Sequence, residues 1–157
     1  MKTSQIIVTV VLIAIIGTFI AFWAKQKPVE VPNPPATSQV ESIKGCYVAT
    51  LAKDVYTLKV LSQTGENFIG TLEFKNFQKD SSSGTYVGTY KDGILLGDYA
   101  FRSEGMDSVM QVIFKKIGND FVRGYGDLTA TGDRFTDISK VTFDNAQTFK
   151  PDPNCAL

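Results

Sequence analysis

Turn residues interrupt the chain at short and regular intervals from residue 43 to residue 157. The segments between the turns hold about 7–11 residues and are rich in Val, Ile, Thr, Tyr and Phe, as strands of an antiparallel meander are. Asp92-Gly93 separates two such segments and favours a type I′ hairpin, because that turn needs a positive φ at both central residues. This pattern restricts residues 43–157 to an all-β fold of consecutive hairpins.

Polar and apolar residues alternate within the predicted strands. Along residues 94–102, Leu95 and Tyr99 fall on one face, whereas Asp98 and Arg102 fall on the other. Such alternation is typical of an antiparallel sheet with one face buried and one face in water. The same pattern runs through residues 67–77, 84–91 and 108–116.

We count eight strands in residues 43–157, the last of them short and near residues 140–143, with a single helical turn at 137–140 before it. The hairpins follow one another without a long crossover. The sequence therefore predicts an eight-stranded antiparallel up-and-down barrel, lipocalin-like in type, because closure removes the exposed edges of an open sheet. A two-sheet β-sandwich is the alternative.

The chain contains two cysteines, Cys46 and Cys155, near the two ends of the predicted barrel. A barrel brings its first and last strands together, so we expect a disulfide that closes a loop of about 110 residues. Two unpaired thiols are the alternative. Because disulfides persist in oxidising compartments, the pairing favours a domain outside the cytoplasm.

Residues 1–24 are mostly apolar, and Lys2 is their only charged side chain. A helix of about 20 residues crosses the hydrocarbon core of a bilayer, so we expect a single-pass transmembrane anchor that is not cleaved, a signal-anchor. A cleaved signal peptide is the alternative. Cleavage after Ala24 would place Phe22 at the −3 position, where signal peptides carry a small residue.

Residues 25–42 contain four of the six prolines of the chain. Proline fixes φ and removes a backbone donor, so this segment is expected to be an extended and semi-rigid tether. Together, the anchor at 1–24, the tether at 25–42 and the barrel at 43–157 predict a membrane protein whose C-terminal domain is periplasmic or at the cell surface.

Several classes of chemistry are disfavoured by the composition. The chain has no histidine, which excludes Ser-His and Cys-His nucleophile pairs and histidine metal sites. Glycine-rich phosphate-binding motifs are also absent from the sequence. Lys and Arg number 16, as do Asp and Glu, so there is no basic field for nucleic acid. We therefore predict no catalytic residue, no metal, no cofactor and no enzyme activity, and the oligomeric state stays open.

Aromatic side chains are predicted to point into the barrel, with glycines between them that leave room. An eight-stranded barrel is wide enough either to be filled by its own side chains or to hold one small ligand. A ligand pocket and a filled core therefore both remain possible. The inward aromatic residues are Tyr86, Tyr90, Tyr99 and Phe101.

A polar loop follows the strand that contains Tyr99. In one interpretation the loop lies at the rim of the barrel, where Ser103 and Glu104 contact a ligand or partner. In the other, Ser103 and Asp107 cap a turn whose geometry requires Gly105. The second interpretation is favoured.

The direction of Arg123 depends on the phase of its strand. If Tyr125 faces inward, Arg123 does too, and a buried guanidinium needs an anionic partner from the protein or from a ligand. If Val122 and Gly124 face inward, Arg123 is a surface residue. The candidate ligand-binding residues are Tyr86, Tyr90, Tyr99, Phe101, Ser103, Glu104, Arg123 and Tyr125.

Short strings of residues carry a resemblance to a known family. They are Cys46-Tyr47, Gly84-Thr85, Gly88-Thr89, Tyr99-x-Phe101-x-Ser103-Glu104-Gly105, Ser108-Val109, Phe114 and Gly124-Tyr125-Gly126. With them the chain resembles a family of small exported bacterial β-barrel proteins, many of them lipoproteins, with no established function. The Gly-Thr-Tyr repeats are also similar to those of avidin-like and lipocalin-like meanders. The chain departs from the lipoprotein members, because it has a long apolar anchor and no convincing lipobox.

The resemblance implies an exported barrel of this size and no particular activity. With the anchor and the aromatic residues, it leads us to expect a membrane-tethered barrel outside the cytoplasm that binds a small or lipidic ligand. The alternative is a structural or interaction module of the cell envelope, with a filled core, that recognises protein or glycan through its loops.

Overall fold

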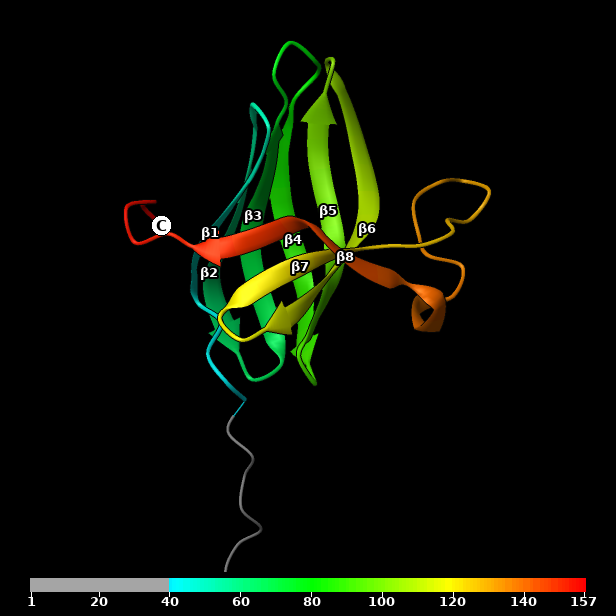
Figure 1. The fold of residues 1–157 in the computed structure, drawn as a ribbon. Helices are drawn as coiled ribbons and strands as arrows, with labels where there is room; N and C mark the ends of the chain where they lie inside the picture. The colour runs from blue at the N-terminus through cyan, green and yellow to red at the C-terminus, as the bar shows by residue number, and fades with distance from the viewer. Residues whose placement is uncertain (1–39) are drawn as a thin grey trace, which may run out of the picture. The chain divides into compact units, whose positions relative to one another are not determined.

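Eight antiparallel strands form a closed barrel in the computed structural model, which describes residues 40–157 (Figure 1). Each strand pairs with the next one along the chain, and the last pairs with the first. The all-β, up-and-down barrel is thus confirmed, and the two-sheet sandwich is not the fold. The strands are β1 (Gly45–Leu51), β2 (Asp54–Thr64), β3 (Asn67–Lys75), β4 (Ser82–Lys91), β5 (Ile94–Ser103), β6 (Met106–Ile117), β7 (Asp120–Tyr125) and β8 (Thr142–Pro151).

The last strand differs from the prediction. A 3₁₀ turn, η1 (Ile138–Lys140), lies where a helical turn was expected, and the Asp137 carboxylate caps it by accepting from the backbone N–H of Ser139. The strand after it, however, is not a short one near residues 140–143, since β8 continues to Pro151. The predicted bounds of the eighth strand were wrong.

A bulge in β8 explains this error. The partners of β7 on β8 jump from Thr148, opposite Val122, to Phe143, opposite Gly124. Residues 144–147 therefore lie in a bulge, and their sequence Asp-Asn-Ala-Gln has no alternation of apolar and polar residues. Without that alternation, the second half of the strand could not be recognised.

The middle of the barrel is filled by its own side chains. Aromatic rings from β4, β6 and β8 meet edge to face, with centroids 5.9 Å apart for Tyr86 and Phe114 and 5.1 Å apart for Phe114 and Phe149. In the middle of the barrel, the structure therefore has a filled core and not a ligand pocket. The largest fully buried side chains are Tyr86, Tyr99, Phe68, Phe114, Phe121 and Phe149.

The glycines between the inward aromatic residues leave no room for a ligand. A Cβ on Gly88 would lie 2.0 Å from the carbonyl oxygen of Leu96 and 2.4 Å from the Cα of Gly97. Gly88 is opposite Gly97 in the ladder between β4 and β5. The two glycines thus allow the backbones of these strands to approach closely.

A disulfide joins Cys46 on β1 to Cys155, with the two Cα atoms 5.9 Å apart. The expected pairing is confirmed. The β1–β8 ladder that it accompanies is short, since it pairs only Tyr47 with Pro151 and Val48 with Lys150. The bond therefore reinforces the seam at which the barrel closes.

The segment before β1 closes one end of the barrel. Ile43 is fully buried, and its carbonyl oxygen accepts from the Tyr47 hydroxyl at 2.9 Å. Glu41 lies near the end of the predicted tether. Its carboxylate accepts from Lys116 Nζ at 2.9 Å and from the Tyr90 hydroxyl at 3.1 Å. The chain thus enters the barrel through this closed end.

The predicted anchor at 1–24 and residues 25–39 of the predicted tether at 25–42 lie outside the described residues. Within residues 40–157, no helix has the length and apolar character needed to cross a membrane.

Candidate functional site at the open end of the barrel

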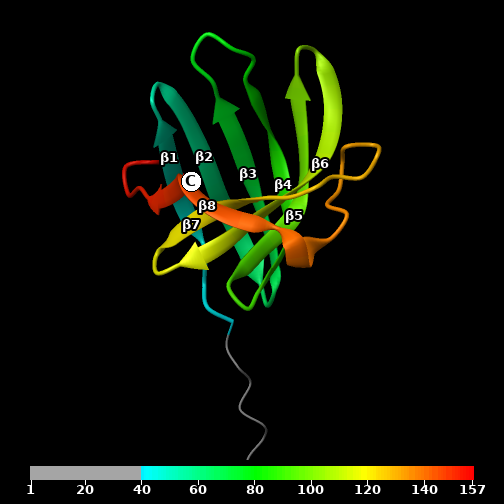
Figure 2. The same ribbon diagram turned by 45° about the vertical axis from the view of Figure 1, so that its right-hand side comes forward.

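At the other end of the barrel, the wall is incomplete because β7 is much shorter than β6. β6 pairs with β7 only from Phe114 to Ile117. Over Met106–Ile113 its strand partner is β5 alone, and the loop after β7 contacts this edge at Gln111, whose backbone N–H donates to the carbonyl oxygen of Asp133 at 2.6 Å. Figures 1 and 2 show the β5–β6 hairpin extending well beyond β7 and β8. Inward side chains at this end form what we call the open-end face: Tyr56, Phe74, Tyr99, Phe101, Met110, Arg123 and Tyr125.

Arg123 points into the barrel. It shares a face of β7 with the fully buried Phe121, and it is opposite Phe114, another core residue, on β6. The other face of β7 is buried as well, because a Cβ on Gly124 would lie 2.6 Å from Val141 and 2.7 Å from Ile113. With both faces covered, alternation along β7 could not decide the phase from sequence.

Aromatic rings surround the guanidinium of Arg123. Its Cζ lies 4.4 Å from the ring centroid of Phe74 and 5.2 Å from that of Tyr125. One nitrogen, Nη1, donates a hydrogen bond of 3.3 Å to the side-chain oxygen of Gln147 in the β8 bulge. Among residues 40–157, no carboxylate oxygen lies within 4 Å of an Arg123 nitrogen.

The charge of Arg123 is not balanced by its neighbours. Burial lowers the pKa of its guanidinium, yet an arginine side chain stays protonated in proteins. Burial also raises the pKa of the hydroxyls of Tyr56, Tyr99 and Tyr125 above the ordinary tyrosine value. These hydroxyls are therefore neutral near pH 7 and provide dipoles but no negative charge.

Donors of Arg123 remain available to a ligand. A guanidinium carries five N–H groups in a planar fork, and the Gln147 contact uses one of them. Within residues 40–157, no side-chain nitrogen or oxygen that is sealed from solvent lacks a hydrogen-bond partner. The guanidinium nitrogens that have no partner are consequently reached by solvent.

Tyr99 and Phe101 of β5 form the apolar part of the open-end face. Their rings stack with centroids 4.7 Å apart and an interplanar angle of 15°. Tyr99 is buried, and its hydroxyl lies 3.1 Å from Ser82 Oγ. Phe101 is only half-buried, as is Met110 on β6. An apolar surface that points inward is thus partly accessible here.

Tyr86 and Tyr90 point inward, as predicted, but lie away from this face. Tyr86 is fully buried in the core and donates a hydrogen bond of 2.8 Å to the carbonyl oxygen of Val112. Tyr90 lies at the closed end, where burial and the hydrogen bond to Glu41 raise its pKa to about 12. The hydrogen bonds of both hydroxyls are therefore made within the protein, and neither tyrosine belongs to the open-end face.

Ser103 and Glu104 lie at the tip of the β5–β6 hairpin. Ser103 pairs with Met106, so Glu104 and Gly105 are the two turn residues, with φ of 52° and 80°. A two-residue hairpin with two positive φ values favours glycine, so the predicted need for Gly105 is confirmed. The predicted capping is wrong, because the Ser103 hydroxyl donates to the carbonyl oxygen of Ser81 and the Asp107 carboxylate pairs with Arg102. Within residues 40–157, neither Ser103 nor Glu104 forms a hydrogen bond or ion pair with Arg123.

Four residues of this region were not among the candidates. Tyr56 and Phe74 contact each other edge to face at 5.2 Å, and Phe74 stacks on Arg123. Phe74 falls in residues 67–77, where polar and apolar residues alternate, but only the tilt of the strands brings it close to Arg123. Gln147 lies in the part of β8 that the sequence did not predict, and Met110 lies among the apolar residues of β6, so neither gave a signal for a site.

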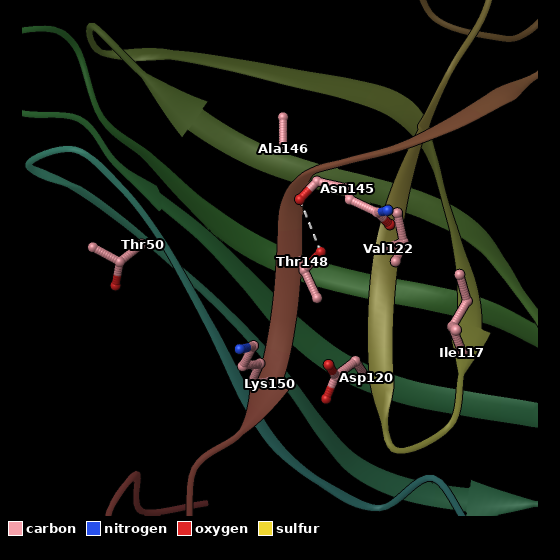
Figure 3. Close-up of a pocket in the computed structure, with 8 residues that line it drawn as sticks. All are labelled: Thr50, Ile117, Asp120, Val122, Asn145, Ala146, Thr148 and Lys150. Atoms are coloured by element: carbon pink, nitrogen blue, oxygen red, sulfur yellow. Dashed lines mark hydrogen bonds between the residues drawn. The ribbon is translucent and has the colours of Figure 1, made fainter.

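Two grooves lie on the outer surface of the barrel. One, of about 460 Å³, runs beside the β1–β8 seam, where the β8 bulge departs from its neighbours (Figure 3). Its polar lining includes Asp120 and Lys150. The other, of about 560 Å³, crosses the outer face of β4, β5 and β6, and Ala100, Phe101 and Val109 are among the residues that line it. Neither groove is lined by Arg123.

The comparisons with protein-family models, with curated proteins and with solved structures found no match for this chain.

Proposed function

We propose that this protein is a membrane-tethered, lipocalin-like barrel outside the cytoplasm that binds a small or lipidic ligand at its open-end face. One observation carries the proposal. Phe101 and Met110 point inward from β5 and β6, beyond the part of β6 that pairs with β7, and both are only half-buried. Binding sites for small molecules are lined mostly by apolar and aromatic side chains, with a few polar groups that orient the ligand.

The filled core limits where a ligand can bind. Tyr86, Phe114 and Phe149 occupy the middle of the barrel, and Ile43 closes the far end. A ligand therefore does not enter deeply, as it does in wide barrels. It lies instead across the open end, with its apolar part against Phe101 and Met110.

The proposed location depends on the N-terminal sequence and on the disulfide. Residues 1–24 have the length and apolar character of a transmembrane helix, and residues 25–42 are rich in proline. The Cys46–Cys155 bond is of the kind that persists in oxidising compartments. These features support a single-pass anchor with the barrel in the periplasm or at the cell surface.

A second candidate function is an interaction module of the cell envelope, which recognises protein or glycan. The filled middle of the barrel and the apolar side chains on its outer face favour it. Ile69 and Val87 are opposite each other on β3 and β4, and both are about half exposed, as is Val109 in the groove across β4, β5 and β6. Such a module needs no accessible inner face.

Photolabelling separates the two functions. The full chain in nanodiscs of zwitterionic lipid would be irradiated with a neutral long-chain alcohol that carries a diazirine, and the labelled peptides would be mapped by mass spectrometry. We expect labelling of β5 and β6 that falls about tenfold in Phe101→Ser, because burial of part of a phenyl ring is worth roughly 1.5 kcal/mol.

Val109→Ser is the matched control, since Val109 is on the same hairpin but on the outer face. Its labelling should equal that of the wild type. Because Phe101 and Val109 both line the outer groove, labelling that falls in Val109→Ser, with or without a fall in Phe101→Ser, would favour the interaction module and reject binding at the open-end face. Labelling that is insensitive to Phe101→Ser would do the same.

A further inference from the structure

We infer that the ligand is an amphipathic anion whose carboxylate or phosphate group is bound by Arg123 while its apolar part contacts Phe101 and Met110. This inference rests on the proposed function, because it assigns the chemistry of the ligand to the same open-end face. Three features of Arg123 carry it: its unbalanced charge, its free donors and its fixed orientation.

The charge of Arg123 has no counterion in the described part of the chain. A charge that is largely removed from water is costly unless it is paired. Here the five ion pairs of residues 40–157 all involve other residues. A bound oxyanion would provide the missing charge.

Nearby carboxylates are held in other contacts. Asp54 accepts a hydrogen bond of 3.2 Å at Oδ2 from the hydroxyl of Tyr56, a residue of the open-end face. Its Oδ1, however, accepts from the backbone N–H of Phe77 at 2.7 Å. The charge of Asp144 contributes to the raised pKa of Tyr125. Its carboxylate accepts from the backbone N–H of Ala146 in the β8 bulge. Neither carboxylate is positioned to neutralise Arg123.

The guanidinium is held in one orientation. Phe74 lies on its face at 4.4 Å, Tyr125 lies at 5.2 Å, and Gln147 accepts from Nη1. A guanidinium that is stacked in this way presents a rigid fork, and two parallel N–H groups match the two oxygens of a carboxylate or phosphate. Lysine at this position would keep the charge but not the fork.

The apolar surface beside Arg123 defines the rest of the ligand. Phe101 stacks on Tyr99, Tyr99 contacts Phe74, and Phe74 stacks on Arg123, so the rings run continuously from the half-exposed Phe101 to the cation. An anion without an apolar part would leave Phe101 in water. The arrangement therefore suits a molecule with a charged head and an apolar body.

Three photoreactive probes of equal chain length test this inference: a carboxylic acid, an alkyl phosphate and the neutral alcohol. The full chain in zwitterionic nanodiscs would be labelled over a range of probe concentrations, and occupancy would be measured on the β5 peptide that contains Phe101. We expect both anionic probes to half-saturate at a concentration about tenfold below that of the alcohol, as charge-assisted hydrogen bonds predict.

In Arg123→Gln this preference should disappear while alcohol labelling persists, and in Arg123→Lys it should be intermediate. Arg102→Gln, on the outer side of β5, is the control and should keep the full preference, since Arg102 pairs with Asp107 at the surface. Circular dichroism would verify the fold of each variant, and the comparison of the three probes on the wild type does not depend on any variant.

The outcomes separate this inference from the proposed function. Equal half-saturation by all three probes on the wild type, or an anion preference that survives Arg123→Gln, would overturn the inference and leave binding at the open-end face intact. Absence of labelling of the β5 peptide by every probe would instead overturn the proposed function, and the inference with it.

Discussion

The guanidinium of Arg123 lies 4.4 Å above the ring of Phe74, although the two residues belong to strands, β7 and β3, that are not neighbours in the sheet. The contact spans the interior of the barrel at its open end. A desolvated cation on an aromatic face gains on the order of 2 kcal/mol, which is less than the cost of burying a charge that has no counterion. The arrangement is therefore poor for stability and well suited to binding an anion.

Replacement of Arg123 by methionine tests whether the arginine is kept at the expense of stability. Methionine has a similar length and no charge to desolvate, so we expect Arg123→Met to be as stable as the wild type or more stable by about 1 kcal/mol. Arg123→Lys, which keeps the charge and loses the planar stack, should be less stable than Arg123→Met. Urea unfolding of the barrel would measure both, and a loss above about 2 kcal/mol in Arg123→Met would contradict a functional role.

The disulfide between Cys46 and Cys155 closes a loop with a sequence separation of 109 residues. In the chain-entropy model its removal costs about 4–5 kcal/mol. We expect the Cys46→Ser, Cys155→Ser double variant to unfold at a lower urea concentration, and reduction of the wild type by dithiothreitol to have the same effect. An unchanged unfolding midpoint after complete reduction would show that the β1–β8 seam does not depend on the bond.

The close approach of β4 and β5 at Gly88 predicts a large effect of one methyl group. A Cβ there would lie 2.0 Å from a backbone oxygen, so Gly88→Ala should lose about 1–3 kcal/mol. Gly45→Ala is the control, because its Cβ would meet only the Tyr47 ring, at 3.5 Å. Urea unfolding should place Gly45→Ala within about 0.5 kcal/mol of the wild type. Equal losses in the two variants would be inconsistent with the close approach.

Tyr90 at the closed end should titrate late. Burial and Glu41 raise the pKa of its hydroxyl to about 12, against about 10 in the unfolded chain. Because the folded pKa is the higher one, the stabilisation from the protonated hydroxyl is complete below pH 10 and is lost as the pH rises from about 10 to 12. NMR titration of the ring carbons would measure this pKa.

Glu41→Gln should lower the pKa of Tyr90, since a neutral amide replaces the carboxylate that accepts from its hydroxyl. Glu66→Gln, an exposed carboxylate at the same end that pairs with Lys91, is the control and should leave it unchanged. If Tyr90 titrates near 10 in the wild type, Glu41 does not close this end of the barrel in solution.

Most of the fold could be predicted because it depends on local patterns. Alternation along residues 94–102 places Leu95 and Tyr99 inside, and barrel closure brings Cys46 to Cys155. The alternation arises because one face of the sheet is buried and the other is in water. The prediction failed where that condition fails, in β8, whose bulge at residues 144–147 breaks the alternation.

The candidate site was only partly predictable. Inward direction was correct for Tyr86 and Tyr90, but whether an inward tyrosine belongs to the core, to the closed end or to the open end depends on strand tilt and length. The direction of Arg123 was ambiguous because the loop after β7 buries the outer face around Gly124 as well. Packing between distant segments decided both questions, and such packing leaves no periodic signal in the sequence.

Native mass spectrometry of the full chain, purified from its own membrane in a mild detergent, tests the central claim most directly. We predict that the wild type and Val109→Ser carry a bound amphipathic anion, and that Phe101→Ser and Arg123→Gln have lost it. If the wild type carries no small molecule in repeated preparations, or if all four proteins retain the same bound species, the open-end face is not the binding site.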